Sequence, residues 1–245
     1  MKENSKKILL WLYPVDATTR WVRKTDFEWL IPDLSSSGLR SLLFYLQHNE
    51  MISYEKVAGD DLISLTSYGK KAISDSFPVF SEERQAWHGD WIMVVFQQPP
   101  KMDASFRYLR KILLTTGFLS LARGVFIYPS ELPDSIKELL HKLYRNSVAV
   151  IRFRQWAFGD ERKIIGQKSG LIDQIELYSS ISKELQQLLR KKMITGELNY
   201  QQKSALLSVF NRFYTLLTQD IGVSHHYFPQ VITAGELLSE FKKLL

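Results

Sequence analysis

Residues 35–48 combine hydroxyl, basic and aromatic side chains at a spacing that suits contact with a nucleic acid. The leucines of this stretch recur at the 3.6-residue period of a helix and predict one apolar stripe, formed by Leu39, Leu42, Leu43 and Leu46. The cap and the outward face of the same helix carry Ser35, Ser36, Ser37, Arg40, Ser41 and Phe44, with Tyr45 on the flank. This outward face is therefore a candidate DNA-binding surface.

Arg40 is the basic side chain that this face presents. An arginine can donate two parallel hydrogen bonds to a guanine edge in the major groove, and hydroxyl groups at a helix N-terminus suit a phosphate. We expect a recognition helix that reads double-stranded DNA through Arg40. Two alternatives stay open: the serines only cap the helix beside a solvated Arg40, or the outward ring of Phe44 marks a protein-binding surface.

Three lysines near this helix could contact the DNA backbone without reading its sequence. Lys56 lies in a predicted hairpin, and Lys70 and Lys71 follow it. Ordinary solvated lysines are an equally open interpretation. Asp60 and Asp61 at the hairpin tip would repel phosphate, so we do not expect the hairpin to enter the minor groove.

The middle of the chain carries a second group of residues that could bind a charged ligand. Arg107, Arg110 and Lys111 are three and four residues apart, which places them together on a helix surface. The candidate effector site consists of these three residues with Arg123, Trp87 and Trp91. The alternative is a solvated helix face on which Asp103 pairs with Arg107.

Catalytic and metal-binding patterns are missing from the sequence. It contains no cysteine, no nucleophile elbow, no phosphate-cradling glycine loop and no dinucleotide fingerprint. His225 and His226 are adjacent and lack a third ligand at a suitable spacing, so we do not expect a metal site. We therefore expect no catalytic residues, no cofactor and no enzymatic activity.

The elements around the candidate recognition helix have the order of a winged helix-turn-helix. Two short helices are predicted at residues 2–13 and 24–31, strands at 51–57 and 62–65 around the turn Ala58-Gly59-Asp60-Asp61, and a further helix from Thr66 to about residue 76. Pro32 ends the second of these helices. Residues 1–80 are thus predicted to form a winged-helix DNA-binding domain.

The next segment has the order βαββαβ, which is typical of a ferredoxin-like α+β sandwich. Strands are predicted at 91–96, on both sides of Ala122-Arg123-Gly124, and at 147–158, with helices at 103–116 and 133–144. This central domain is expected to span residues 85–165, and the fold class is therefore α+β.

Long apolar-periodic helices follow at 171–194 and 200–218, with a shorter one at 233–245. They predict a C-terminal helical domain over residues 170–245. Because the two long helices carry more apolar surface than one small domain can bury, we expect them to form a homodimer interface.

Composition limits the class of protein. The 45% of hydrophobic and 24% of charged residues are globular proportions, and no apolar run approaches the ~20 residues that cross a bilayer. The N-terminal apolar stretch is too short and too aromatic for a signal peptide, so we expect a cytoplasmic protein without membrane contact. The net charge of +6 suits a polyanionic partner, although residues 1–80 carry ten basic and ten acidic side chains.

Three stretches of the chain resemble the PaaX family of bacterial transcriptional regulators, typified by repressors of phenylacetate catabolism. The first stretch comprises residues 38–43, 51–52 and 63–71, the second residues 87–96, 107–110, 117–118 and 124–129, and the third residues 213–220 and 227–229. Two positions depart from the family pattern. Phe44 and Tyr45 stand where the family has a polar and then a basic residue, and Gln97-Gln98-Pro99 follows Phe96 where the family has Asp-Ile-Pro.

The resemblance implies a cytoplasmic dimeric repressor that responds to an acyl-coenzyme A thioester or an aromatic acid. Two other functions stay open. The central order also resembles a small metal-dependent nuclease of CRISPR integration complexes, or an adaptor derived from one, but that nuclease needs a carboxylate where Gln97 and Gln98 stand. The third candidate is a winged-helix protein-interaction module.

Overall fold

The N-terminal elements of the computed structural model form a winged helix, as predicted. They are α1 (Glu3–Leu12), β1 (Val22–Arg23), the 3₁₀ helix η1 (Lys24–Phe27), α2 (Ser36–His48), β2 (Ile52–Val57), β3 (Asp60–Leu65) and α3 (Ser67–Ser76). The three strands form an antiparallel sheet in the order β1-β3-β2, in which Val22 is paired with Ile63. Hairpin β2–β3 is the wing. The structure describes residues 1–16, 18–57, 59–97 and 104–244.

One predicted helix of this region is much shorter than expected. The sequence predicted a helix over residues 24–31, but only the 3₁₀ turn η1 forms, and residues 28–34 continue as turns. These turns place Leu30 and Ile31 in the core beside Phe27. Phe27, Leu30 and Ile31 have the i, i+3, i+4 spacing of a helical stripe, so their apolar pattern alone could not distinguish these turns from a helix.

Local hydrogen bonds fix the start of α3 against the end of α2. Thr66 caps α3, because its Oγ1 accepts a hydrogen bond from the backbone N–H of Gly69 at 3.1 Å. The same hydroxyl donates to the carbonyl oxygen of Glu50 at 2.5 Å. A Cβ atom on Gly69 would lie 2.1 Å from the carbonyl oxygen of Met51, so this position has no room for a side chain.

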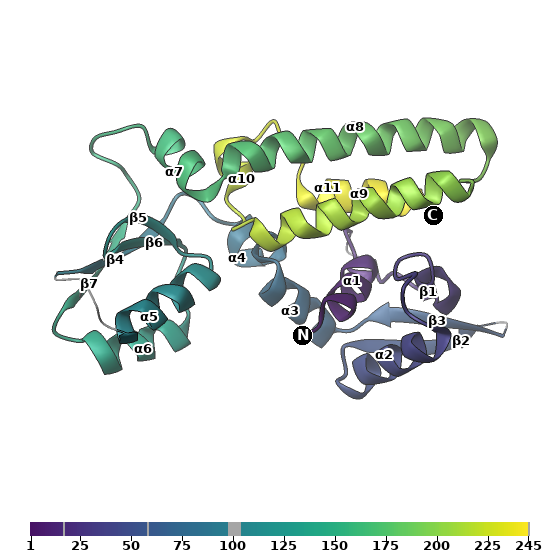
Figure 1. Ribbon diagram of the computed structural model, residues 1–245, viewed down its shortest axis with the longest axis horizontal. Coiled ribbons are helices and arrows are strands. Elements are labelled where there is room, and N and C mark those ends of the chain that lie inside the picture. Colours follow the sequence, from purple (N-terminus) through teal and green to yellow (C-terminus); the bar gives the residue numbers. More distant parts are fainter. Residues whose placement is uncertain (17, 58, 98–103, 245) are drawn as a thin grey trace. The chain divides into compact units, whose positions relative to one another are not determined.

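The central elements form the predicted ferredoxin-like sandwich. They are β4 (Trp91–Phe96), α5 (Ala104–Thr115), β5 (Leu119–Ala122), β6 (Val125–Pro129), α6 (Asp134–Tyr144) and β7 (Val148–Phe153). The antiparallel sheet has the order β5-β6-β4-β7, and α5 and α6 cover one face of it (Figure 1). The core of this face includes Phe96 and Phe106, whose ring centroids are 5.1 Å apart.

The other face of the central sheet is covered by segments that the sequence did not predict to lie there. Helix α7 (Glu161–Ser169) follows the strand β7, and α10 (Ser224–Tyr227) lies in what was predicted to be a polar connection. Ile165 of α7 and Val223 share a core with Trp91. Two short helical segments, η2 (Pro78–Phe80) and α4 (Glu82–Gln85), precede this part of the chain.

The long C-terminal helices α8 (Leu171–Thr195), α9 (Tyr200–Gln219) and α11 (Ala234–Lys243) share one core with the winged helix (Figure 1). Trp11 of α1 meets Phe210 of α9 edge to face with centroids 5.9 Å apart, and Phe210 in turn meets Phe241 at 5.4 Å. The apolar surface that motivated the predicted dimer interface is therefore largely buried within the chain.

The described chain divides into two compact units. The terminal unit comprises residues 1–81, 175–220 and 230–245, and the central unit comprises residues 82–174 and 221–229. This grouping differs from the predicted division into domains 1–80, 85–165 and 170–245. An apolar stripe on a helix predicts burial but not the surface that buries it, and here that surface belongs to the winged helix. Within the described ranges, no helix is long and apolar enough to cross a membrane.

Candidate nucleic-acid interface

Helix α2 presents the predicted outward face to solvent. Leu39, Leu43 and Leu46 are buried, whereas Phe44 is 69% and Tyr45 48% exposed. The rings of Phe44 and His48 are stacked, with centroids 6.2 Å apart and planes 11° from parallel. Exposed aromatic rings of this size on a helix surface favour contact with another molecule.

The N-terminus of α2 carries a run of serines, one of which caps the helix. Ser35 is the cap, since its Oγ accepts a hydrogen bond from the backbone N–H of Gly38 at 3.2 Å. Ser41 donates its hydroxyl to the carbonyl oxygen of Ser37 at 3.0 Å. Ser36 and Ser37 are exposed beside the cap, in the position where helix N-termini bind phosphate, and the Oγ of Ser37 is hydrogen-bonded to the Oγ of Ser35 at 3.0 Å. Capping thus accounts for Ser35 and engages Ser37, whereas Ser36 has no part in it.

Arg40 lies on the exposed face of α2 in a position to reach another molecule. Its Nε donates a long hydrogen bond, 3.4 Å, to the carbonyl oxygen of Ser36. Among the described residues no carboxylate forms an ion pair with its guanidinium group. The terminal N–H groups therefore remain available to a guanine edge or a phosphate.

The three candidate lysines differ in their surroundings. Lys56 lies opposite Asp61 in the wing, and Asp60 follows at the turn, so the tip of the wing carries little net positive charge. Lys71 forms an ion pair with Asp75 at 3.2 Å, and Lys70 is exposed. Of the three, Lys70 has the least opposing charge.

A cleft of about 1110 Å³ runs beside α2 and was not foreseen from the sequence. The N-terminal turn of α1 forms one wall with Lys2, and α2 forms the other wall with Ser41 and Tyr45. Lys2 thus lies near the candidate interface. The lysine-rich start of the chain was the signal that could have identified it.

The structure does not bring the candidate effector residues together. Trp87 and Trp91 are buried and pack edge to face at 5.0 Å, on the side of the sheet that α7 covers. Arg107, Arg110 and Lys111 are exposed on α5, which packs on the opposite face of the same sheet. Arg123 is exposed in the turn between β5 and β6. Successive side chains of a strand point to opposite faces of the sheet, and Trp91 of β4 points to the face opposite the one that α5 covers.

Both tryptophans have structural partners within the central unit. The indole N–H of Trp87 donates to the carbonyl oxygen of Asp90 at 2.6 Å, and that of Trp91 donates to Glu161 at 3.3 Å. The hydroxyl of Tyr227 also donates to Glu161, and burial, followed by this contact, raises the pKa of Tyr227 far above its ordinary value. These residues fix segment 221–229 to the sheet.

Arg84 is a buried charge that sequence reasoning missed. Its guanidinium group donates to the carbonyl oxygen of Pro129 and lies 4.5 Å from the ring centroid of Tyr128. Burial lowers the pKa of Arg84, and the contacts with Tyr128 oppose that shift. The residue ties the start of the central unit to β6.

His226 packs against the ring of Trp87 at 4.8 Å, which gives it a packing role. Among the described residues, no cluster of three His, Asp, Glu or Cys side chains could hold a metal ion. Gln97, at the end of β4, is exposed. Gln98, Asp103 and the predicted pair between Asp103 and Arg107 lie outside the described residues.

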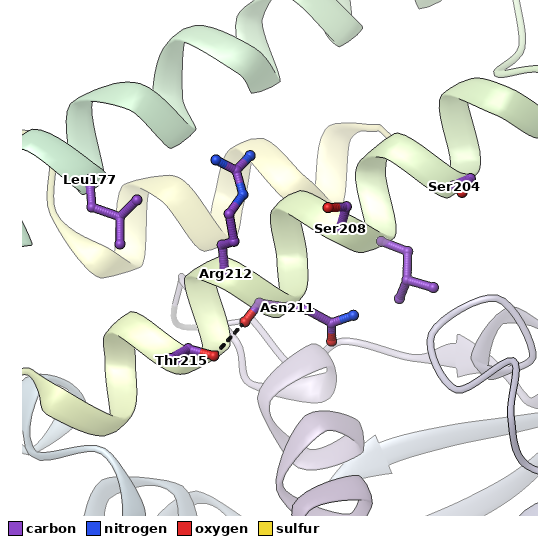
Figure 2. Close-up of a pocket in the computed structure, with 7 residues that line it drawn as sticks. Leu177, Ser204, Ser208, Asn211, Arg212 and Thr215 are labelled. Atoms are coloured by element: carbon purple, nitrogen blue, oxygen red, sulfur yellow. Dashed lines mark hydrogen bonds between the residues drawn. The ribbon is translucent and has the colours of Figure 1, made fainter.

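A second groove, of about 550 Å³, runs along α9 (Figure 2). Ser204, Ser208 and Thr215 line it, with Leu177 from α8. Its cation, Arg212, forms an ion pair with Glu184, and Figure 2 shows Arg212 and Asn211 pointing in different directions from the helix. The groove therefore offers no free charge among its described lining residues.

The terminal unit contains a winged helix, and the central unit contains a ferredoxin-like sheet. Residues 84–165 match the family model described as the PaaX protein central Cas2-like domain. This match covers β4 to β7 and the first half of α7, and it is consistent with the resemblance found in the sequence. The central part of the chain is therefore similar to the central domain of PaaX proteins.

Solved structures and curated proteins provide two further comparisons. The uncharacterized protein Rv0674 from Mycobacterium tuberculosis has a solved structure that is similar over 96% of this chain and 89% of that chain, with 16% identity and a TM-score of 0.44. No curated protein matches the sequence.

Proposed function

We propose that this protein is a transcriptional repressor that binds double-stranded DNA through α2 of its winged helix. The observation that carries the proposal is the outward face of α2, where Arg40 is exposed and free of any ion pair within the described chain. A helix of this size fits the major groove and contacts base edges with its N-terminal half. Arg40 lies in that half.

Backbone contacts would come from groups beside the helix. Ser36 and Ser37 at the start of α2 suit a phosphate, and Lys2 and Lys70 add positive charge near or beyond the helix. The wing contributes less, because Lys56 lies opposite Asp61. This distribution favours docking by α2 with the wing outside the minor groove.

The effector response is the second part of the proposal. A small acid or an acyl-coenzyme A thioester would release the repressor from DNA. The winged helix shares its core with α8, α9 and α11, so a ligand that binds among these helices can favour one position of α2 over another. The match of residues 84–165 to the PaaX central domain supports this mode of regulation.

We also propose a homodimer in the cytoplasm. Three large apolar side chains at the connection between α8 and α9 support self-association: Met193 is 84%, Ile194 84% and Tyr200 87% exposed. A two-fold assembly through this connection would double the DNA contacts of one small reading helix. The sequence had suggested the apolar faces of α8 and α9 as the dimer interface. Because those faces are buried within the chain, we propose the exposed connection between the two helices instead.

A protein-interaction module is the second candidate function, and the exposure of Phe44 and Tyr45 favours it. Selection of binding sites from a random double-stranded DNA pool separates the two functions. A regulator enriches a defined sequence with an affinity that falls steeply with salt, whereas an interaction module enriches none. We expect no cleavage of the selected DNA with magnesium or manganese, because the end of β4 carries the neutral amide of Gln97.

A further inference from the structure

The central sheet has two edge strands, which differ in how well they are protected against pairing with an added strand. β5, at one edge, has four residues and a β-bulge between Ser120 and Ala122. β7, at the other edge, has six residues, pairs with β4 in one uninterrupted register and contains no proline. Bulges, prolines and short edge strands are common devices that stop another strand from pairing with a sheet. The β7 edge has none of these devices.

The outer side of β7 presents backbone hydrogen-bonding groups that no described strand uses. At the end of the ladder, the backbone N–H of Gln97 donates to the carbonyl oxygen of Ser147 at 3.0 Å. Because hydrogen-bonded pairs alternate along an antiparallel ladder, Ile151 bonds to β4, whereas the N–H and C=O groups of Val148 and Val150 point away from it. Within the described part of the chain, β4 is the one strand that pairs with β7. The outer side of β7 can therefore pair with another extended segment.

The side chains of β7 leave apolar surface exposed on both faces of the sheet at this edge. Val150 lies opposite Val94 in the ladder, on the face that α5 and α6 cover, and it is 48% exposed. Ile151 lies on the other face and is 49% exposed. An added strand would cover both side chains, because its own residues alternate between the two faces.

A groove of about 360 Å³ lies between α6 and β7, within the central unit. Most of its lining side chains are apolar: Ile92, Leu132, Leu140, Val148 and Val150. Side chains of an added strand that face the helices would enter this groove. Strand addition of this kind takes its affinity from backbone hydrogen bonds and its specificity from pockets for alternate side chains.

The rim of the groove carries positive charge. Arg145 and His141 are exposed there, and among the described residues no carboxylate forms an ion pair with either of them. Glu131 also lines the groove, but it is already paired with Arg152. Complementary charge across an interface favours the right partner over others. The rim therefore favours a segment that carries carboxylates.

We propose that the β7 edge binds an extended, acidic segment of another protein by antiparallel strand addition. Its β-branched side chains enter the groove, and its carboxylates lie beside Arg145 and His141. The edge of a second copy of this chain fits less well, because β7 carries Arg152 and no carboxylate. All residues of the site belong to the central unit, so the proposal does not depend on DNA reading by α2.

Fluorescence anisotropy of the labelled peptide Thr-Glu-Thr-Val-Thr-Val-Thr-Glu-Thr, titrated with the full chain, tests the site. Both valines and both glutamates face the groove when the peptide pairs with β7, and we expect a dissociation constant below about 1 mM. The same peptide with glutamine in place of glutamate should bind about twofold to fivefold more weakly, as expected for exposed ion pairs. N-methylation of both valines removes the N–H groups that face β7 and should weaken binding about tenfold or more.

Variants of the chain test the same contacts from the other side. Val150→Pro removes an outward N–H of β7 but no hydrogen bond to β4, and edge strands tolerate proline. It should weaken peptide binding about tenfold or more, whereas Val150→Thr, which keeps the N–H, should change it less than about threefold. Arg145→Gln should weaken binding about twofold to fivefold, and Arg110→Gln, at an exposed position of α5, is the matched control.

Thermal melting shows whether each variant is folded, and the N-methylated peptide covers the case in which Val150→Pro does not fold. Absence of peptide binding at about 1 mM would overturn the proposal. Equal binding of the glutamine or the N-methylated peptide, or unchanged affinity of a folded Val150→Pro protein, would overturn it as well. A dimer that Val150→Pro converts into a monomer in light scattering would assign the edge to a second copy and contradict an acidic partner.

Discussion

Trp11 of α1 and Phe210 of α9 meet edge to face with ring centroids 5.9 Å apart, although they are far apart in the sequence. Both side chains are fully buried. This contact joins the first helix of the winged helix to the C-terminal helices in one core. The winged helix that contains α2 and the C-terminal helices therefore share one hydrophobic core.

Phe210→Ala should destabilise the winged helix as well as α9. Truncation of a buried phenylalanine costs about 3–5 kcal/mol, because it removes apolar contacts and leaves a cavity. Chemical denaturation measures the loss, and hydrogen exchange should show weaker protection of the amides in α1 and α2. Phe158→Ala is the control, since Phe158 is 94% exposed. Unchanged protection of α1 in Phe210→Ala would contradict a shared core.

Gly69→Ala should destabilise the terminal unit by about 1–3 kcal/mol or more. The added Cβ would lie 2.1 Å from the carbonyl oxygen of Met51, so the backbone must shift. Gly235→Ala in α11 is the matched control, because the nearest atoms to its Cβ would be at 3.9 Å. That change should be neutral or stabilising by up to about 1 kcal/mol through helix propensity. Equal melting temperatures of the two variants would contradict the close contact at Gly69.

Stability should depend on pH through Lys242. Its pKa in the folded protein is about 7, below the ordinary value of 10.5, because of burial and then the charge of Arg20. Between these two values the unfolded chain binds more protons than the folded one, so this residue makes stability rise with pH by at most about 1.4 kcal/mol per pH unit. Below pH 7 the lysine is protonated in both the folded and the unfolded chain. Its unfavourable contribution to the free energy of unfolding is then at its largest and no longer changes with pH.

Lys242→Met should remove the part of the rise in stability with pH that comes from Lys242. Urea denaturation at several pH values measures the free energy of unfolding and so tests this. Lys168→Met, at an exposed position, is the control and should keep the pH dependence of the unchanged chain. An identical pH dependence of Lys242→Met and the unchanged chain would show that Lys242 is not held in a desolvated position.

Replacing Met193 and Ile194 by serine should convert a dimer into a monomer. Both side chains are 84% exposed at the end of α8, so the change should leave the fold intact. Light scattering should give about twice the chain mass of 28.6 kDa before the change and the mass of one chain after it. A 28.6 kDa species for the unchanged protein at micromolar concentration would contradict the proposed dimer.

Local patterns predicted most of the elements. The leucine stripe and the serine cap of α2, and the β4 run from Trp91 to Phe96, each occupy one short stretch, so their bounds are nearly those of the structure. Helix α7 was missed although Asp160 caps it and Gly170 ends it in a left-handed conformation. Those cap signals were present in the sequence.

Contacts between distant segments could not be predicted in the same way. Alternation along β4 shows that Trp91 and Ile92 face opposite sides of the sheet, but it does not show that α7 covers one side and α5 the other. Without knowledge of which helix covers which face, the candidate effector residues could be grouped only by chemical type. In the structure the tryptophans and the basic residues of α5 lie on opposite faces of the sheet. A cleft of about 590 Å³ that Trp11 and Arg20 line likewise depends on Lys192 of α8 and Lys203 of α9, more than 150 residues further along the chain.

The affinity of Arg40→Ala for its selected DNA, measured over a range of salt concentrations, tests the central claim most directly. If Arg40 contacts a guanine edge, the change should cost about 1–3 kcal/mol on the selected site and remove discrimination at one base pair. If it contacts phosphate, affinity should fall about equally on all sequences, and the salt slope should drop by roughly one. Arg110→Ala, on α5, is the control. A folded Arg40→Ala protein with unchanged affinity and salt slope would contradict DNA reading by α2.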